Sequence, residues 1–80
     1  MRLSWRKIEG AYPTFEAESG LFFFGIRPAR KEDLDYVENG SRAYIHSKRE
    51  GYDRLFKTFR TLREAMDACE EIAGPLEKWD

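Results

Sequence analysis

Histidine and cysteine, the residue types that carry much of enzyme chemistry, occur once each in this chain, as His46 and Cys69. Cys69 lies within an apolar stripe at helical spacing, which is typical of a buried and unreactive thiol. His46 alternates with other residues along a predicted strand, where an exposed or half-buried side chain is expected. One cysteine and one histidine cannot supply four zinc ligands, and one cysteine cannot form an internal disulfide. We therefore expect no catalytic residue, no metal site and no cofactor, and interpret the protein as not an enzyme.

Carboxylates and phosphate-binding loops are the other residue patterns that could do chemistry. Glu32, Asp33, Asp35 and Glu38 form an acidic run, but their spacing is not that of a calcium-binding loop. The sequence contains no Walker or dinucleotide-binding motif. A solvated acidic surface is therefore the expected role of this run.

The charges of the chain cancel in sum but not along the sequence. Fourteen Lys and Arg stand against 15 Asp and Glu, which gives a net charge of -1. Residues 42–63 carry seven cations against two carboxylates, whereas residues 64–80 carry six carboxylates against one lysine. A partner therefore meets two segments of opposite sign rather than a neutral chain.

These segments define two candidate binding surfaces. The acidic surface consists of Glu64, Asp67, Glu70 and Glu71. The basic surface, with aromatic residues between its cations, consists of Arg42, Tyr44, Lys48, Arg49, Arg54 and Lys57. Basic and aromatic side chains together can contact phosphates and stack on bases. The same cations also suit an ordinary edge hairpin, in which Lys and Arg prevent aggregation.

Five stretches of alternating or continuous apolar residues predict strands, at 3–8, 12–17, 21–27, 42–48 and 54–59. Residues 21–27 have the pattern of a central strand buried on both faces. Gly25 within them indicates either a bulge or a close approach of another group. Pro13 restricts the second stretch to a sheet edge or an irregular segment.

Two helices are predicted. Leu34 and Val37, three residues apart, suggest a short helix near 31–37 that Asn39-Gly40 closes. Thr61 and Glu64 form a capping box at the start of a second helix, whose apolar stripe includes Cys69 and which Gly74-Pro75 is expected to end. Leu76 and Trp79 are expected to fold back onto the domain. The predicted fold is a single α+β domain, residues 1–80, in which a mainly antiparallel sheet of three to five strands packs against the C-terminal helix.

One stretch of the chain resembles a known family. Ala43-Tyr44-Ile45, Gly51 and the run from Phe56 to Ala65 are similar to the N-terminal arm-binding domain of phage-type tyrosine integrases, over residues 42–72. That resemblance implies a three-stranded sheet backed by a helix, and an origin as a small phage or mobile-element accessory protein. In those integrases the sheet enters the DNA major groove, whereas here the helix is acidic on its outer side and no catalytic domain is present.

Two functions follow from the charge pattern. The first is a protein-binding module, a phage-encoded inhibitor of a host nucleic-acid-binding defence complex of the anti-CRISPR kind, whose acidic helix competes with phosphate for a basic groove. Tyr12, Tyr36 and Tyr52 would be its aromatic anchors if exposed. The alternative is a small DNA- or RNA-binding protein that uses the 42–60 hairpin and its sheet face. The longest apolar run has six residues, against about 20 for a membrane span, so we expect a cytoplasmic protein without a membrane partner.

Overall fold

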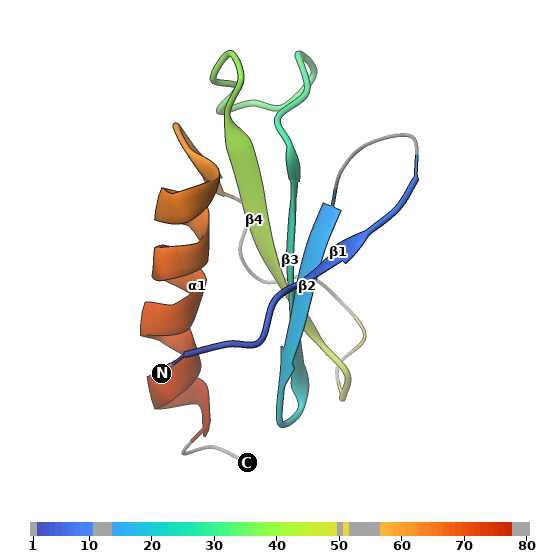
Figure 1. The fold of residues 1–80 in the computed structure, drawn as a ribbon, viewed down its shortest axis with the longest axis vertical. Helices are drawn as coiled ribbons and strands as arrows, with labels where there is room; N and C mark the ends of the chain where they lie inside the picture. The colour runs from blue at the N-terminus through green and yellow to red at the C-terminus, as the bar shows by residue number, and fades with distance from the viewer. Residues whose placement is uncertain (1, 11–13, 50, 52–56, 78–80) are drawn as a thin grey trace.

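The computed structural model describes residues 2–10, 14–49, 51 and 57–77, with the backbone alone for 75–77. These residues form one antiparallel sheet and one helix (Figure 1). The elements are β1 (Arg6–Ile8), β2 (Thr14–Ser19), β3 (Phe22–Pro28), β4 (Ser41–Ser47), β5 (Lys57–Phe59) and α1 (Leu62–Glu77). The strands lie in the sheet in chain order, and each pairs antiparallel with the next. The predicted α+β fold with a helix packed on an antiparallel sheet is confirmed.

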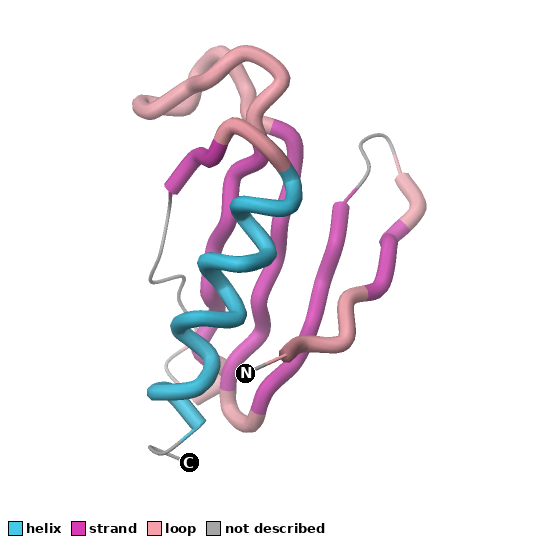
Figure 2. Tube along the Cα trace, turned by 60° about the vertical axis from the view of Figure 1, so that its left-hand side comes forward, coloured by secondary structure: helices cyan, strands magenta, loops and turns pink. Residues whose placement is uncertain are grey.

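The core lies between α1 and one face of the sheet (Figure 2). Phe24 and Ile26 of β3 are almost fully buried there, next to Ala43 and Ile45 of β4. The helix contributes its small residues Ala65, Cys69 and Ala73, which are also buried. Because residues on a strand alternate between faces, β3 and β4 direct every second side chain away from this core.

Helix α1 begins as predicted and ends later. The hydroxyl of Thr61 accepts a hydrogen bond from the Glu64 backbone N–H at 3.1 Å, which is the expected N-cap contact. The predicted stop at Gly74-Pro75 is wrong, because the helix continues to Glu77. Pro75 removes one backbone donor, but so near the end of the helix this costs only one of the last hydrogen bonds. The predicted packing of Leu76 and Trp79 lies outside the described side chains.

The predicted helix near 31–37 is wrong. Residues 29–40 form a loop of successive turns instead, with backbone hydrogen bonds from Asp33 N to Arg30 O at 2.9 Å and from Tyr36 N to Asp33 O at 3.2 Å. Asn39 closes the loop in the left-handed region, with φ at 58°. Leu34, whose spacing from Val37 suggested the helix, is fully exposed. We refer to this segment as the 29–40 loop.

Strand positions agree with the prediction to within a few residues where the chain is described. β1 begins at Arg6 rather than Leu3, because Leu3 turns into the core and donates its backbone N–H to Glu70 of α1 at 2.9 Å. Residues 12, 13 and 54–56 of two predicted strands lie outside the described residues. Within the described chain, no helix is long and apolar enough to cross a membrane.

Candidate functional site

The sheet has a second face, opposite α1, against which no described helix packs, and the 29–40 loop contacts the end of it that carries Arg27 and Arg42. We call this second face the open face. It carries the side chains that alternate with the core residues, and the register places them in rows across the strands. Its residues are Arg6, Ile8, Thr14, Glu16, Glu18, Phe23, Gly25, Arg27, Arg42, Tyr44, His46 and Thr58. Three aromatic or imidazole rings therefore stand on a face that α1 does not cover.

Tyr44 owes its position to Gly25, its direct neighbour across the β3–β4 pair. A Cβ atom at Gly25 would lie 2.2 Å from Cζ and 2.4 Å from the hydroxyl oxygen of Tyr44. The far end of the tyrosine ring thus lies directly over the glycine, where any larger residue would displace it. Pairing along β3 is continuous from Phe22 to Pro28, so Gly25 marks the predicted close approach and not a bulge.

A second pair of rings lies in the next row of the open face. The rings of Phe23 and His46 have centroids 6.4 Å apart and are tilted by 40°. The ammonium group of Lys48 lies 4.5 Å from the Phe23 centroid and pairs with the Glu18 carboxylate at 2.7 Å. The Lys48 ammonium group is therefore held next to the Phe23–His46 pair, at the margin of the open face.

Two depressions flank Tyr44 on the open face. One, of about 230 Å³, is lined by Glu16, Phe23, Phe24, Tyr44 and His46. The other, of about 340 Å³, is lined by Ile8, Glu9, Gly10, Thr14, Arg27, Arg30 and Tyr44. The first contains the Glu16 carboxylate, and the second contains the Glu9 carboxylate together with the guanidinium groups of Arg27 and Arg30.

The two arginines of β3 and β4 are held by the 29–40 loop. Arg27 donates two hydrogen bonds to the Asp33 carboxylate, at 2.8 Å and 3.0 Å, and Asp33 also accepts the Arg30 backbone N–H at 2.8 Å. These donors favour the ionised carboxylate and so lower the pKa of Asp33. The hydrogen bond from Arg27 is the largest cause, and the one from the Arg30 N–H is the second. The Arg27–Asp33 hydrogen bond also raises the pKa of Arg27.

Asp35 makes the second attachment of the loop. It accepts hydrogen bonds from the Thr58 backbone N–H at 2.7 Å and hydroxyl at 2.8 Å, and it forms an ion pair with Arg42. The Thr58 hydroxyl contact is the main cause of the lowered pKa of Asp35. The expectation of a purely solvated acidic run is therefore wrong for Asp33 and Asp35, which anchor the loop, whereas Glu32 and Glu38 are exposed.

The predicted basic surface is only partly assembled. Arg42 and Tyr44 lie on the open face, Lys48 lies at its margin, and Arg49 is exposed just beyond β4. Lys57 pairs opposite the core residue Ala43, so it lies on the helix side, with its ammonium 5.3 Å from the Phe59 ring centroid. Arg54 lies outside the described residues.

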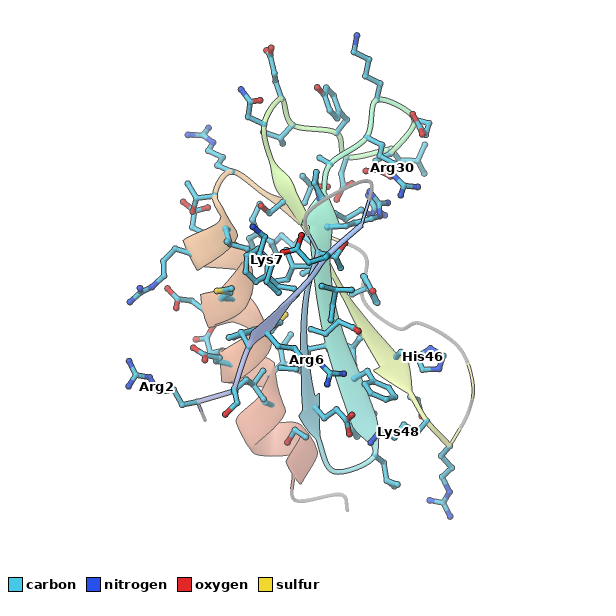
Figure 3. All side chains as sticks on the ribbon, turned by 45° about the vertical axis from the view of Figure 1, so that its right-hand side comes forward. Arg2, Arg6, Lys7, Arg30, His46 and Lys48 are labelled. Carbon is cyan, nitrogen blue, oxygen red and sulfur yellow. The ribbon has the colours of Figure 1, made fainter. Side chains whose placement is uncertain are left out.

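Other strands complete this surface with residues that the sequence prediction missed. Figure 3 shows Arg6 in front of the middle of the sheet, Arg30 toward one end, and His46 and Lys48 toward the other. Arg6 belongs to β1 and Phe23 to β3, and Glu16 lies between them on β2. The period-two pattern could have assigned these residues to one face, but only the register shows that they are neighbours.

The predicted acidic surface is not uniform. Glu64, Asp67 and Glu71 are exposed on α1, and Arg63 lies 3.5 Å from Asp67. Glu70 is half-buried because it accepts the Leu3 backbone hydrogen bond. Of the four predicted acidic residues, Glu70 therefore stabilises the fold and is less available to a partner than the other three.

No family model, no curated protein and no solved structure matches this chain. The integrase resemblance therefore stays a prediction, and the site is interpreted from its own chemistry.

Proposed function

We propose that the open face binds single-stranded nucleic acid. The observation that carries the proposal is the Tyr44 ring held over Gly25, next to the Phe23–His46 pair, on a face against which no described helix packs. Exposed rings on a small sheet are a common platform on which unpaired bases stack. A duplex keeps its bases stacked inside, so a single strand is the matching ligand.

Basic side chains around the rings would contact the phosphates. Arg6, Arg30 and Arg49 are exposed, and Figure 3 shows Arg6 in front of the middle of the sheet and Arg30 toward one end. Arg27 and Arg42 are engaged by Asp33 and Asp35, and Lys48 by Glu18, so these cations add less net charge. We expect about two or three phosphate contacts, and hence a plot of log affinity against log salt with a slope of about -1.4 to -2.

The first experiment compares single-stranded and double-stranded oligonucleotides of about ten residues by fluorescence anisotropy. The wild type is expected to favour the single strand, and Tyr44→Ala to weaken that binding about tenfold or more, because a stacking ring is lost. Tyr36→Ala is the matched control, since Tyr36 is a tyrosine at 37% exposure that lies in the 29–40 loop and not on the open face. Circular dichroism confirms that each variant is folded. Absence of binding, or equal binding by the Tyr44 variant, would refute the proposal.

A second candidate function is the protein-binding module, and the 29–40 loop is the observation that favours it. Leu34 is fully exposed and Tyr36 is 37% exposed, on a loop that Asp33 and Asp35 hold in place. Tyr36 also borders a groove of about 420 Å³ that includes Phe15 and Leu62. A rigid loop loses little entropy when its apolar side chains enter a partner's pocket.

The partner proposed for this module is a host nucleic-acid-binding complex, and the protein would be its phage-encoded inhibitor. Exposed Glu64, Asp67 and Glu71 on α1 would steer the domain toward a basic groove.

A pull-down from a host extract tests this candidate. Leu34→Ser, and separately Glu64→Lys with Glu71→Lys, should each abolish capture of the complex, while Tyr44→Ala leaves capture unchanged. Capture that needs Tyr44 but neither Leu34 nor the carboxylates would contradict the module and favour binding through nucleic acid.

A further inference from the structure

We propose that the depression beside Tyr44 selects guanine from the bases of a bound strand, an inference that rests on nucleic-acid binding by the open face. The depression is bounded by the rings of Phe23, Tyr44 and His46, and the Glu16 side chain lines it as well. Its volume of about 230 Å³ and its aromatic walls suit one planar base. The selecting group is the carboxylate of Glu16.

Glu16 is half-buried. Within the described residues it accepts no hydrogen bond and forms no ion pair. Arg6 is its direct partner across the β1–β2 pair, yet the two side chains form no ion pair. A partly buried carboxylate gains from a donor, because hydrogen bonds to a charged group are among the stronger ones. The open face thus presents a carboxylate that lacks a donor among the described residues, in the same depression as the rings of Phe23, Tyr44 and His46.

The four bases differ in the donors that they offer to such a group. Guanine carries a ring N–H and an amino group side by side on its pairing edge, so it can donate two parallel hydrogen bonds to one carboxylate. Adenine and cytosine each offer an amino group without an adjacent ring N–H, and uracil offers a ring N–H without an amino group. Only guanine therefore satisfies both oxygens of Glu16.

The surroundings of the depression agree with a nucleotide ligand. Tyr44 and His46 are two residues apart on β4, which separates their backbone positions by about 7 Å. A base that stacks in this space is flanked by Tyr44 on one side and by the Phe23–His46 pair on the other. Beyond Tyr44 lies the second depression, which contains Glu9, Arg27 and Arg30. Arg27 is paired with Asp33, so the adjoining phosphate would meet mainly the exposed side chain of Arg30.

The experiment uses the full chain and short labelled oligouridines that carry one central guanosine, inosine, adenosine or cytidine. The wild type is expected to bind the guanosine strand about tenfold more tightly than the inosine strand, because inosine lacks the amino group and one hydrogen bond is lost. Glu16→Gln should bring the four affinities to within about twofold of one another, since an amide offers one acceptor oxygen instead of two. Glu38→Gln, at an exposed position of the 29–40 loop, is the matched control and should keep the preference.

The outcomes separate the two proposals. If no oligouridine strand binds, nucleic-acid binding by the open face is wrong and guanine selection falls with it. If the strands bind but guanosine is not preferred, or if Glu16→Gln keeps the guanosine preference, guanine selection is overturned and the open-face proposal stands. Glu16 lies outside the core, so its variant is expected to fold, and its thermal midpoint is measured beside the wild type.

Discussion

Gly25 shows how a single missing side chain shapes the open face. Its lack of a Cβ atom allows the Tyr44 ring to cross β3 and lie over the strand. In the proposed binding mode, a tyrosine held in this way would not need to rearrange when a base stacks on it. The position of the ring therefore depends on the glycine as much as on the tyrosine.

Gly25→Ala is expected to move Tyr44 while keeping the fold. The new methyl group would lie 2.2 Å from Cζ of Tyr44, but the end of a side chain can swing aside, so the stability loss should be about 1 kcal/mol. Binding of a single strand should fall about as far as in Tyr44→Ala. Anisotropy and thermal melting measure both effects. Tyr36→Ala, in the 29–40 loop, is again the control, and equal binding by Gly25→Ala and the wild type would contradict the role of the contact.

Cys69 is expected to resist modification in the folded protein. Burial, with a smaller contribution from the charge of Glu70, raises the pKa of its thiol to about 12, so the reactive thiolate is nearly absent at neutral pH. Iodoacetamide labelling followed by mass spectrometry should give little product without denaturant and full labelling in urea. Rapid labelling of the folded chain would show that the helix–sheet core opens readily.

At the scale of elements, the 29–40 loop is fixed by long-range ionic contacts rather than by its own sequence. Asp33 joins it to Arg27 of β3, and Asp35 joins it to Thr58 of β5 and Arg42 of β4. The loop therefore connects three strands at one end of the sheet. Both carboxylates must be ionised to accept all of these donors.

Acid should weaken this attachment. The pKa of Asp33 is lowered in the folded chain from its ordinary value of 3.8, so the unfolded chain takes up a proton first as the pH falls. The stabilisation is complete above about pH 4 and is lost progressively below it. Urea denaturation across this range should show a falling free energy of unfolding. Asp33→Asn should reduce this dependence of the free energy of unfolding on pH. Asp67→Asn, at an exposed helix position, is the control and should leave it unchanged. A pH dependence in Asp33→Asn equal to that of the wild type would contradict the role given to Asp33.

The elements that local patterns specify were predictable, and those that distant contacts specify were not. The alternation of apolar and polar residues in 42–48 correctly predicted β4 and which of its side chains face the core. Thr61 correctly predicted where α1 begins. The 31–37 helix rested on one apolar pair, and the contacts of Asp33 and Asp35 with remote residues outweigh that weak preference. The site was harder to predict because Phe23 lies in a continuous apolar run, which hides that it points away from the core.

At the scale of the whole molecule, the start of the chain and the helix stabilise each other. Leu3 is buried in the core, and its backbone N–H is bound by Glu70. The segment before β1 thus closes the core beside α1. Figure 2 shows α1 in front of one face of the sheet, and the open face lies on the other side. The hydrophobic core and the proposed binding surface therefore lie on opposite faces of the sheet.

Leu3→Ala should therefore destabilise the protein without altering its ligand preference. Truncating a buried leucine costs about 2–5 kcal/mol, a large share of the roughly 4–12 kcal/mol expected for a chain of this size. Chemical denaturation measures the loss, and Arg2→Ala, at an exposed neighbour, is the control. A loss below about 1 kcal/mol would show that Leu3 adds little to the core.

The margins of the sheet have a consequence of their own. β1 and β5 are each three residues long as described, and they carry exposed Arg6, Lys7 and Lys57. Short, charged border strands are poor templates for another chain to join edge to edge, the route by which sheets polymerise into fibrils. The protein can thus keep a broad, partly aromatic sheet surface while its short, charged edge strands disfavour self-assembly. A ligand of the kind proposed is expected to contact the open face and not to add a strand at the edge of the sheet.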